Sequence, residues 1–344
     1  MLTENLCLCM EQLTVSPAIQ TRPKIFTWNA HTSYLYYLSQ GNFDIYIPVK
    51  DDKCAGYYGR GDVVAFGPNV VEVPAAEVKN LAFDCVLFQS EKNYLSDQYE
   101  ILSAEQRELP RIYLEHDPPS LAPADTKHIV DDPDVLLVHV THFNHLMWDN
   151  NRTPTRIIEH GVIDTGARYT GEINKGIVVI NNIQQRGRRL GLDVFLKLRD
   201  SVPLDLIGIG TENLGLGEVQ YDQVPDFIKQ YRFFFNPIRF TSLGLAVCEA
   251  MMIGMPVIGL ATTELVSVIQ NGVSGYIHTD IQYLEKRMND LLRQKDLAQS
   301  MGSEGKIIAE ERFNIARFTK DWEDTFIRVI ANRYRMRNSI SVES

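Results

Sequence analysis

The chain has 344 residues, of which 44% are hydrophobic and 23% are charged, and its formal net charge is −10. The composition is that of a globular protein, and the length predicts two domains because single hydrophobic cores stop growing beyond roughly 250–300 residues. The acidic balance argues against a nucleic-acid-binding surface, and the sequence has no run of the ~18–20 apolar residues that span a bilayer.

The N-terminal stretch MLTENLCLCMEQLTV carries acidic residues where a secretory signal carries Lys or Arg. The chain has five cysteines, and Cys7 and Cys9 have no second pair at zinc-ribbon spacing. We therefore interpret Cys7 and Cys9 as ordinary side chains rather than a zinc-ligand pair, and we expect the protein in a reducing cytoplasm.

The first half of the chain alternates strand-like apolar runs with helical periods, which is the pattern of parallel α/β sheets. Strands are predicted at 24–28, 43–49, 63–66, 85–89, 111–115 and 136–140, and helices at 34–40 and 91–102. A polar, Pro-rich stretch follows the fifth of these strands, and long loops of this kind are often functional.

A second series of strands is predicted at 175–183, 204–210, 233–237, 256–261 and 275–279, followed by a helix at 283–293 and a long C-terminal helix. The Gly-rich turn formers of GVIDTGARYTGE place a hinge near 161–170. We therefore predict an α/β fold of two facing Rossmann-like domains, over 1–160 and 161–318, with a C-terminal helix and tail over 319–344. Ligands of such sheets bind beyond the carboxyl ends of the strands, in the cleft between the domains.

The stretch FFFNPIRFTSLGLAVCEAMMIGMPVI, which begins at Phe233, is almost free of charge. Pro237 ends the strand, and Thr241 or Ser242 can cap a helix that begins at about Leu243. Gly244 in the first turn permits close approach of a ligand, and the free N–H groups of a helix N-terminus favour an anion such as a diphosphate.

Glu249 is the lone acid of this helix and lies about two turns inside it, too deep to act as a cap. One interpretation is a partly exposed helix acid or a member of a local ion pair. The other, which we favour because so few polar neighbours surround it, is a carboxylate that accepts hydrogen bonds from vicinal ribose hydroxyls.

The same run resembles the signature P-S-x-x-E-x-F-G-L-x-x-x-E-A-M-A-x-G-x-P-V-[IV] of family-4-type glycosyltransferases with the GT-B fold. The matching positions are Pro237, Gly244, Leu245, Glu249, Ala250, Met251, Gly254, Pro256 and Val257. RIIEHGVID, LDLIGIG and TTELVSVIQNGVSGYI are similar to further family motifs, so the resemblance covers roughly residues 155 to 325. The chain also resembles the cyanobacterial heterocyst-envelope and exopolysaccharide glycosyltransferases.

The resemblance implies a GT-B fold with an acceptor-side domain, a nucleotide-sugar donor domain and a last helix that crosses back to the first domain. It implies a retaining, metal-independent enzyme that needs no other cofactor. This enzyme would move a hexose, with glucose favoured, from a UDP-sugar to a glycan or lipid-linked acceptor in exopolysaccharide synthesis. The alternatives are a catalytically inert nucleotide-binding subunit and a nucleotide-sugar 2-epimerase.

The sequence departs from the signature at the acid eight positions before Glu249, where it has Thr241. In the family the first acid lies near the donor sugar and the second binds the ribose. We therefore expect Glu249 to keep the ribose contact and Thr241 to contact the sugar through its hydroxyl. The donor-binding residues expected from this segment are Thr241, Ser242, Leu243, Gly244, Leu245 and Glu249.

The phosphate charge is expected to be neutralised by the arginines of QQRGRRLGLD. The family has an Arg and a Lys in this loop; Gly191 and Asp193 match the end of its pattern, but the Lys position holds a leucine. Arg186, nearest the strand end, is our first choice for the diphosphate, with Arg188 and Arg189 behind it. The alternative is a solvated basic turn.

His116 directly follows a predicted strand at the mouth of the cleft, where the family often has a histidine near the reaction centre. Together with Arg186 and Thr241 it completes the expected catalytic residues. On the acceptor side we expect His31, Thr32, Ser33 and His142.

The spacing of His139, His142 and His145 invites a metal site, but no carboxylate cluster accompanies them, so packing and loop hydrogen bonds are favoured. The C-terminal helix carries Arg328, Arg333, Arg335 and Arg337. These arginines suggest peripheral contact with the inner membrane, although a solvated helix end is the simpler interpretation.

Overall fold

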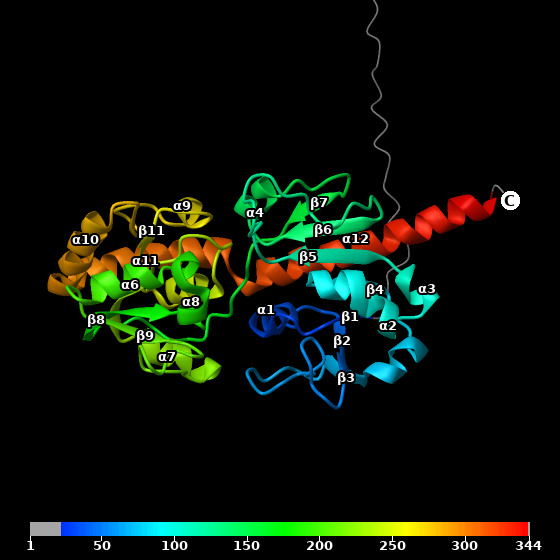
Figure 1. Cartoon of the computed structure of the whole chain (residues 1–344), viewed down its shortest axis with the longest axis horizontal. Coiled ribbons are helices and arrows are strands. Elements are labelled where there is room, and N and C mark those ends of the chain that lie inside the picture. Colours follow the sequence, from blue (N-terminus) through cyan, green and yellow to red (C-terminus); the bar gives the residue numbers. More distant parts are fainter. Residues whose placement is uncertain (1–21, 343–344) are drawn as a thin grey trace, which may run out of the picture.

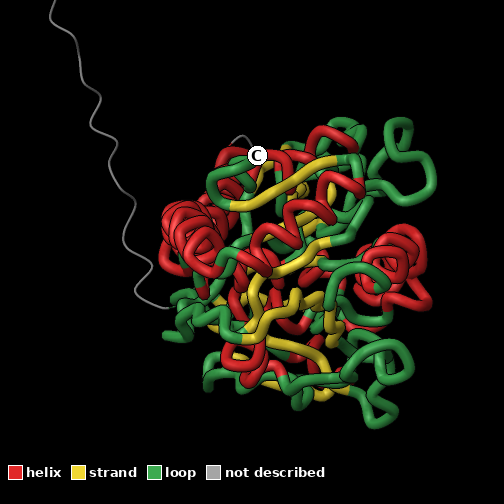
Figure 2. The backbone as a smooth tube through the Cα atoms, turned by 90° about the vertical axis from the view of Figure 1, so that its left-hand side faces the viewer, coloured by secondary structure: helices red, strands yellow, loops and turns green. Residues whose placement is uncertain are grey.

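A computed structural model describes residues 22–342, with side chains to residue 333. Cys7, Cys9 and the side chains of Arg335 and Arg337 lie outside this part of the chain. Two parallel sheets stand side by side along the long axis of the molecule, one in each half (Figure 1). In the perpendicular view, strands run through the interior with helices around them (Figure 2). The predicted α/β fold of two Rossmann-like halves is confirmed.

The first sheet has seven parallel strands. In spatial order these are β3 (Val70–Pro74), β2 (Asp44–Val49), β1 (Lys24–Thr27), β4 (Cys85–Phe88), β5 (Arg111–Glu115), β6 (Val135–His139) and β7 (Thr155–Ile157). Its α-helices are α1 (Thr32–Leu38), α2 (Gln98–Ile101), α3 (Ala104–Arg107) and α4 (His142–Met147). A π-helical turn at Asn93–Asp97 precedes α2, and a 3-10 helix covers Ala75–Asn80.

The second sheet has five parallel strands, in the order β12 (Gly275–His278), β11 (Val257–Leu260), β10 (Tyr231–Asn236), β8 (Ile173–Val179) and β9 (Leu204–Ile207). Its α-helices are α5 (Ile183–Arg186), α6 (Leu192–Arg199), α7 (Val224–Ile228), α8 (Leu245–Ile253), α9 (Leu265–Val268), α10 (Ile281–Arg293) and α11 (Lys295–Arg312). Gly187–Leu190 and Tyr221–Gln223 are 3-10 helices. β10 is buried along its whole length, as expected for a central parallel strand.

The last helix, α12 (Ile315–Val342), starts at the second domain and runs back along the first (Figure 1). Its Trp322 Nε1 donates a hydrogen bond to the hydroxyl of Tyr34 in α1 over 3.1 Å, and Phe326 packs edge-on against Phe43 at 5.0 Å. These buried aromatic side chains fix the second domain to the first. Among residues 22–342, no helix is long and apolar enough to cross a membrane.

The predicted strand at 63–66 is wrong, because this segment lies in an irregular loop and the next strand is β3. Glycines flank the short apolar run, and Val63 is 45% exposed rather than part of a sheet. This loop between β2 and β3 instead brings Asp62 and Val63 to the cleft. β7 and α4 were not predicted, because each is too short to show a hydrophobic periodicity.

Gly191 connects the arginine-bearing loop to α6 and lies against the end of β10. Its φ of 80° is in the left-handed region, and a Cβ at this position would lie 1.9 Å from the carbonyl oxygen of Pro237. Only glycine permits this contact, so Gly191 sets the distance between the arginine loop and the segment after β10.

We expect Gly191→Ala to destabilise the protein more than Gly254→Ala. Both glycines have left-handed φ values, 80° and 93°, so both substitutions carry a conformational penalty of roughly 1–2 kcal/mol. The nearest atom to a Cβ at Gly254 is 3.8 Å away, which is ordinary contact, whereas at Gly191 the backbone must move. Urea denaturation of the two variants measures the difference; equal losses of stability would contradict the close contact at Pro237.

Candidate functional site

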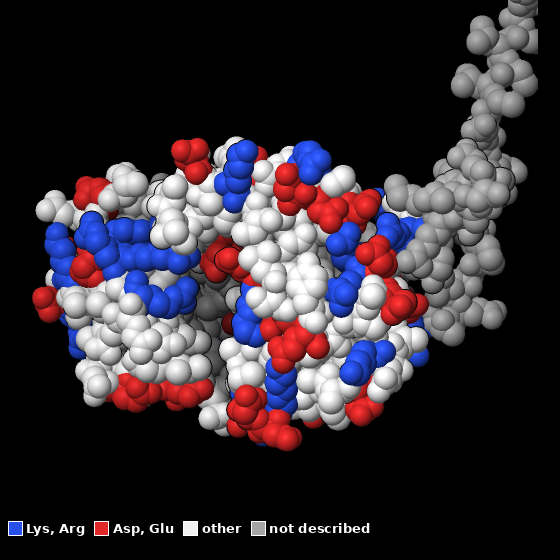
Figure 3. All heavy atoms as spheres, turned by 45° about the vertical axis from the view of Figure 1, so that its right-hand side comes forward, with Lys and Arg blue, Asp and Glu red and all other residues white. Residues whose placement is uncertain are grey.

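The cleft lies between the carboxyl ends of the two sheets and is visible as a hollow between the two halves of the molecule (Figure 3). Two cavities in it, of about 410 and 380 Å³, share the side chains of Asp62, Tyr221 and Glu249. The larger of these two is also lined by Gly208 and Ile209, from the loop after β9. Glu249 therefore stands between two ligand-sized spaces at the junction of the domains.

Glu249 is held by hydrogen bonds from both domains. Its Oε1 accepts from the hydroxyl of Tyr37 in α1 over 2.7 Å and from the hydroxyl of Tyr221 over 2.8 Å. The two tyrosine oxygens are themselves 2.9 Å apart. Among residues 22–333 no cation pairs with this carboxylate, so the ion-pair interpretation of Glu249 is wrong.

Burial raises the pKa of Glu249, and the hydrogen bonds from Tyr37 and Tyr221 offset only part of this effect. The same environment raises the pKa of both tyrosines, chiefly through burial and next through the nearby carboxylate. The tyrosines therefore remain protonated and act as donors. Further hydrogen-bond donors that reach Glu249 would stabilise its charged form.

The N-terminus of α8 differs from the predicted one. The helix begins at Leu245 with Gly244 as its N-cap, and no side chain caps it, so the predicted cap by Thr241 or Ser242 is wrong. Ser242 is buried, and its carbonyl oxygen accepts from Thr263 Oγ1 over 3.5 Å. A Cβ at Gly244 would meet no atom within 4 Å, so the space beside the uncapped first turn is open.

The three arginines of the loop after β8 have different surroundings. Arg189 donates through Nε to the carbonyl oxygen of Phe240 over 3.0 Å, and its Nη2 lies 3.5 Å from Asp117 Oδ1. Burial lowers the pKa of Arg186, while Asp117 raises it and Arg189 lowers it, which places the two arginines and the acid in one electrostatic group.

Arg188 belongs to a different ion pair. Its Nη1 lies 2.6 Å from Asp193, which also pairs with Arg239 at 2.5 Å. Arg188 is therefore engaged on the flank of α6, whereas Arg189 reaches Asp117.

His116 follows β5 and faces the cleft with a defined tautomer. Gln89 uses its Nε2 to donate to Thr27 Oγ1 and to the Trp28 carbonyl, at 3.0 and 2.9 Å. Its Oε1 is therefore an acceptor, and His116 Nε2, 3.2 Å away, carries the proton and donates. Nδ1 of His116 keeps its lone pair.

The ring of His116 lies 3.8 Å from that of His31, centroid to centroid. Burial, together with the neighbouring His31 and His160, holds the pKa of His116 well below its usual value. Burial also lowers the pKa of His31. At neutral pH both imidazoles are uncharged, so this edge of the cleft offers hydrogen-bonding groups rather than positive charge.

The remaining acceptor-side residues belong to α1 and α4. Thr32 Oγ1 donates to Asn29 Oδ1 over 3.1 Å, and Ser33 lines the 410 Å³ cavity. His142 is exposed at the start of α4, where the next residue, Phe143, donates its N–H to Glu264 of the second domain.

His139 and His145 make hydrogen bonds to Asn150 and Thr155, at 2.7 and 3.1 Å. Among residues 22–333 no group of three or more His, Cys, Asp or Glu side chains could hold a metal ion. Metal independence stays a prediction.

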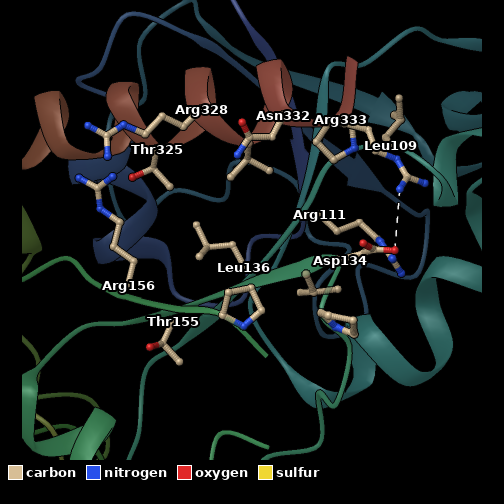
Figure 4. Close-up of a pocket in the computed structure, with 15 residues that line it drawn as sticks. Leu109, Arg111, Asp134, Leu136, Thr155, Arg156, Thr325, Arg328, Asn332 and Arg333 are labelled. Carbon is tan, nitrogen blue, oxygen red and sulfur yellow. Dashed lines mark ion pairs between the residues drawn. The ribbon is translucent and has the colours of Figure 1, made fainter. Parts of the chain in front are cut away.

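A larger cavity of about 540 Å³ lies elsewhere, between α12 and the amino ends of β5, β6 and β7 (Figure 4). Arginines line it, but Arg111 pairs with Asp132 at 3.1 Å, and Arg333 lies 3.9 Å from Asp134. Its charges are largely paired, and it lies at the amino ends of the strands, whereas ligands of such sheets bind at the carboxyl ends. We therefore do not assign the functional site there.

The structure also brings Tyr37, Tyr221 and Asp117 to the cleft, which the sequence analysis did not select. Asp117 directly follows His116 at a strand end. The expectation that ligands bind at the carboxyl ends of the strands could therefore have identified it. Tyr37 lies in an apolar helix and is 4% exposed, which is typical of a core residue, but its hydroxyl reaches the cleft. Tyr221 follows a loop without a regular pattern.

Residues 207–307 match the family model described as "Glycosyl transferases group 1". Among solved structures, sucrose-phosphate synthase from Thermosynechococcus elongatus has a TM-score of 0.67 at 13% identity, over 91% of this chain and 100% of that one. HepE of Anabaena in complex with UDP has a TM-score of 0.63 at 12% identity, over 90% and 100%. AviGT4, a glycosyltransferase involved in avilamycin A biosynthesis, has a TM-score of 0.60 at 12% identity, over 90% and 98%. Among curated proteins, none matches the sequence.

The chain thus has the fold of these GT-B glycosyltransferase structures, and its residues 207–307 are similar to group 1 glycosyl transferases. The resemblance inferred from the signature around Glu249 is confirmed at this level. The roles of individual site residues stay predictions.

We expect Glu249→Gln to stabilise the ligand-free protein at pH 8 but not at pH 5. Because its pKa is raised in the folded state, the carboxyl group contributes stability at low pH that is lost as pH rises through the raised pKa. Gln removes this loss, which amounts to about 1.4 kcal/mol for each unit by which the pKa is raised.

Thermal unfolding at the two pH values measures this effect, with Glu304→Gln on the exposed face of α11 as the control. If Glu249→Gln lowers the midpoint more at pH 8 than at pH 5, the carboxylate stabilises the ligand-free fold and the account of its burial is wrong.

Proposed function

We propose that the protein is a retaining glycosyltransferase that transfers a hexose from a UDP-sugar to a glycan or lipid-linked acceptor. The observation that carries this proposal is the carboxylate of Glu249, which stands at the domain junction, unpaired by any cation in the described part of the chain and supplied only with hydroxyl donors. A ribose offers two vicinal hydroxyls that can take the places of the Tyr37 and Tyr221 hydroxyls.

UDP and glucose are the donor components that the structural neighbours support. HepE of Anabaena, with 13% identity, has been solved with UDP and glucose and with UDP-glucose. In this chain the 410 Å³ cavity beside Gly208 and Ile209 would take the base, next to the ribose at Glu249. A glucosyl donor is proposed on this basis, and a role in exopolysaccharide synthesis is proposed on the sequence resemblance alone.

The diphosphate would lie over the open first turn of α8, beside Gly244. The free N–H groups of that turn and the positive end of the helix dipole favour an anion. Arg186 and Arg189 supply the counter-charge, and Arg189 would exchange its contact with Asp117 for a phosphate oxygen. Charge that develops on the departing diphosphate is thereby stabilised.

The chemistry requires no protein nucleophile. The bond from the anomeric carbon to the diphosphate oxygen breaks, the acceptor hydroxyl attacks on the same face, and its proton passes to the departing oxygen. His116, neutral and fixed by Gln89, can accept a hydrogen bond from a sugar hydroxyl through Nδ1.

The acceptor would enter from the first domain. A cavity of about 310 Å³ there is lined by His31, His116, Trp148 and Arg189. His31, Thr32, Ser33 and His142 remain the proposed acceptor-side residues. Independence from metal ions and peripheral attachment to the inner membrane are also proposals.

The direct test is turnover of UDP-glucose, measured as UDP release with and without glycan or lipid-linked acceptors. Release of UDP with formation of an α-linked product supports the proposal. Binding of UDP without turnover of any UDP-hexose would favour an inert nucleotide-binding subunit. Conversion of UDP-N-acetylglucosamine to its 2-epimer would favour the epimerase.

We expect Arg186→Ala to lower kcat with a smaller effect on UDP affinity, because the leaving-group charge is largest in the transition state. Loss of one positioned donor to such charge typically costs about 2.7–4 kcal/mol, or roughly 100- to 1000-fold in kcat. Arg188→Ala is the matched control from the same loop, since Arg188 pairs with Asp193. Equal losses in the two variants would argue for a merely solvated basic loop.

We expect His116→Ala to leave UDP affinity nearly unchanged and to reduce both hexose transfer and donor hydrolysis. His116 belongs to the first domain and lies beside the sugar, whereas the nucleotide contacts proposed above come mainly from the second. His145→Ala is the control, because His145 bonds to Thr155 away from the cleft. Parallel loss of UDP binding and turnover in His116→Ala would indicate a structural role instead.

A further inference from the structure

We infer that Asp117 supplies the donor-sugar carboxylate that the signature places at position 241 and that this chain lacks there. This inference rests on the proposed function, because it assigns a contact to the hexose of a UDP-sugar. It adds a specificity-determining residue from the opposite domain.

Asp117 meets the second domain at the residue that replaces the signature acid. The hydroxyl of Thr241 donates toward Asp117 Oδ1 over 3.5 Å, across a sequence separation of 124 residues. The same Oδ1 lies 3.5 Å from Arg189 Nη2. Neither contact uses Oδ2, and the Asp117 side chain is 48% exposed. A carboxylate oxygen is thus available in the cleft beside Thr241.

The backbone of Asp117 is fixed on both sides. Its N–H donates to Glu115 Oε1 over 2.9 Å, and its carbonyl oxygen accepts from Trp148 Nε1 over 2.9 Å. The backbone therefore holds Asp117 next to His116, in the 310 Å³ cavity that Arg189 also lines. Such anchoring is expected of a group that positions a ligand and is unnecessary for a solvated surface acid.

An acid at this point suits a hexose because each sugar hydroxyl can donate to it, and hydrogen bonds to a charged acceptor are stronger than those to a neutral hydroxyl. Thr241 alone offers only a neutral contact. Asp117 restores the charge from the other side of the cleft, where its Oδ1 already lies 3.5 Å from Thr241 Oγ1.

Because Asp117 pairs with Arg189, loss of its charge should affect UDP and UDP-glucose differently. In the ligand-free protein Asp117 and Arg189 neutralise each other, and a diphosphate competes with Asp117 for Arg189. Removal of the Asp117 charge should therefore leave UDP affinity unchanged or increase it, while contact with the sugar of UDP-glucose is lost. A merely structural residue would weaken both ligands together.

The test compares UDP affinity, from calorimetry, with the KM and kcat for UDP-glucose in Asp117→Asn. Asp131→Asn is the matched control, since Asp131 is an exposed acid of the same domain that pairs with Arg152. We expect UDP affinity equal to or higher than that of the wild type, and kcat/KM for UDP-glucose lower by about tenfold or more. In Asp117→Ala/Thr241→Glu, the acid at the signature position should restore most of this loss.

Equal weakening of UDP and UDP-glucose in Asp117→Asn, or no change in either, would overturn the inference even if the double variant does not fold. In both cases the wild-type enzyme remains active, so the proposed function stands. Failure of the proposed function appears instead in the wild-type protein, as absence of UDP binding or turnover, and overturns this inference with it.

Discussion

The two domains meet at a partly buried carboxylate, Glu249, that has no cation beside it among the described residues. Glu249 accepts hydrogen bonds from a tyrosine of each domain, and these bonds connect the two domains across the cleft in the ligand-free state. The arrangement is costly for an ionised acid, since burial raises the pKa of Glu249 despite both bonds. Such a site contributes little to the stability of the ligand-free protein. A ligand that brings further hydrogen-bond donors stabilises the carboxylate, which is a common property of binding sites.

Opposite charges meet across the cleft near this junction. The protein is acidic overall, yet Arg186 and Arg189 lie at the carboxyl end of the second sheet, and Asp117 faces them from the first domain. Uncharged groups also face the cleft: the open first turn of α8 and the neutral imidazoles of His31 and His116. A nucleoside diphosphate-sugar has the complementary sequence of a hydroxyl pair, two phosphates and a polyhydroxyl ring.

The fold could be predicted from sequence because its signals are local. Buried parallel strands such as Tyr231–Asn236 are continuous apolar runs that can be recognised in the sequence. The segment around Glu249 keeps a signature whose residues lie close together in the chain. The failures are local too: the run at 63–66 is apolar enough for a strand, but its glycines place it in a loop that reaches the cleft.

The partners in the site could not be predicted, because they depend on contacts between distant parts of the chain. Tyr37 lies 212 positions from Glu249, and its place in an apolar helix suggests only packing. Asp117 and Thr241 are 124 positions apart, and nothing in either segment indicates that they meet. The helix cap at Thr241 or Ser242 failed for the same reason, since the Thr241 hydroxyl has a partner in the other domain.

A crystal structure of the complex with UDP tests the central claim most directly. The account predicts ribose hydroxyls at hydrogen-bond distance from Glu249 Oε1, at least one tyrosine hydroxyl displaced from it, and the diphosphate beside Gly244 with Arg186 or Arg189 turned toward it. UDP bound elsewhere, or bound in the cleft with Glu249 still held by both Tyr37 and Tyr221, would contradict the account.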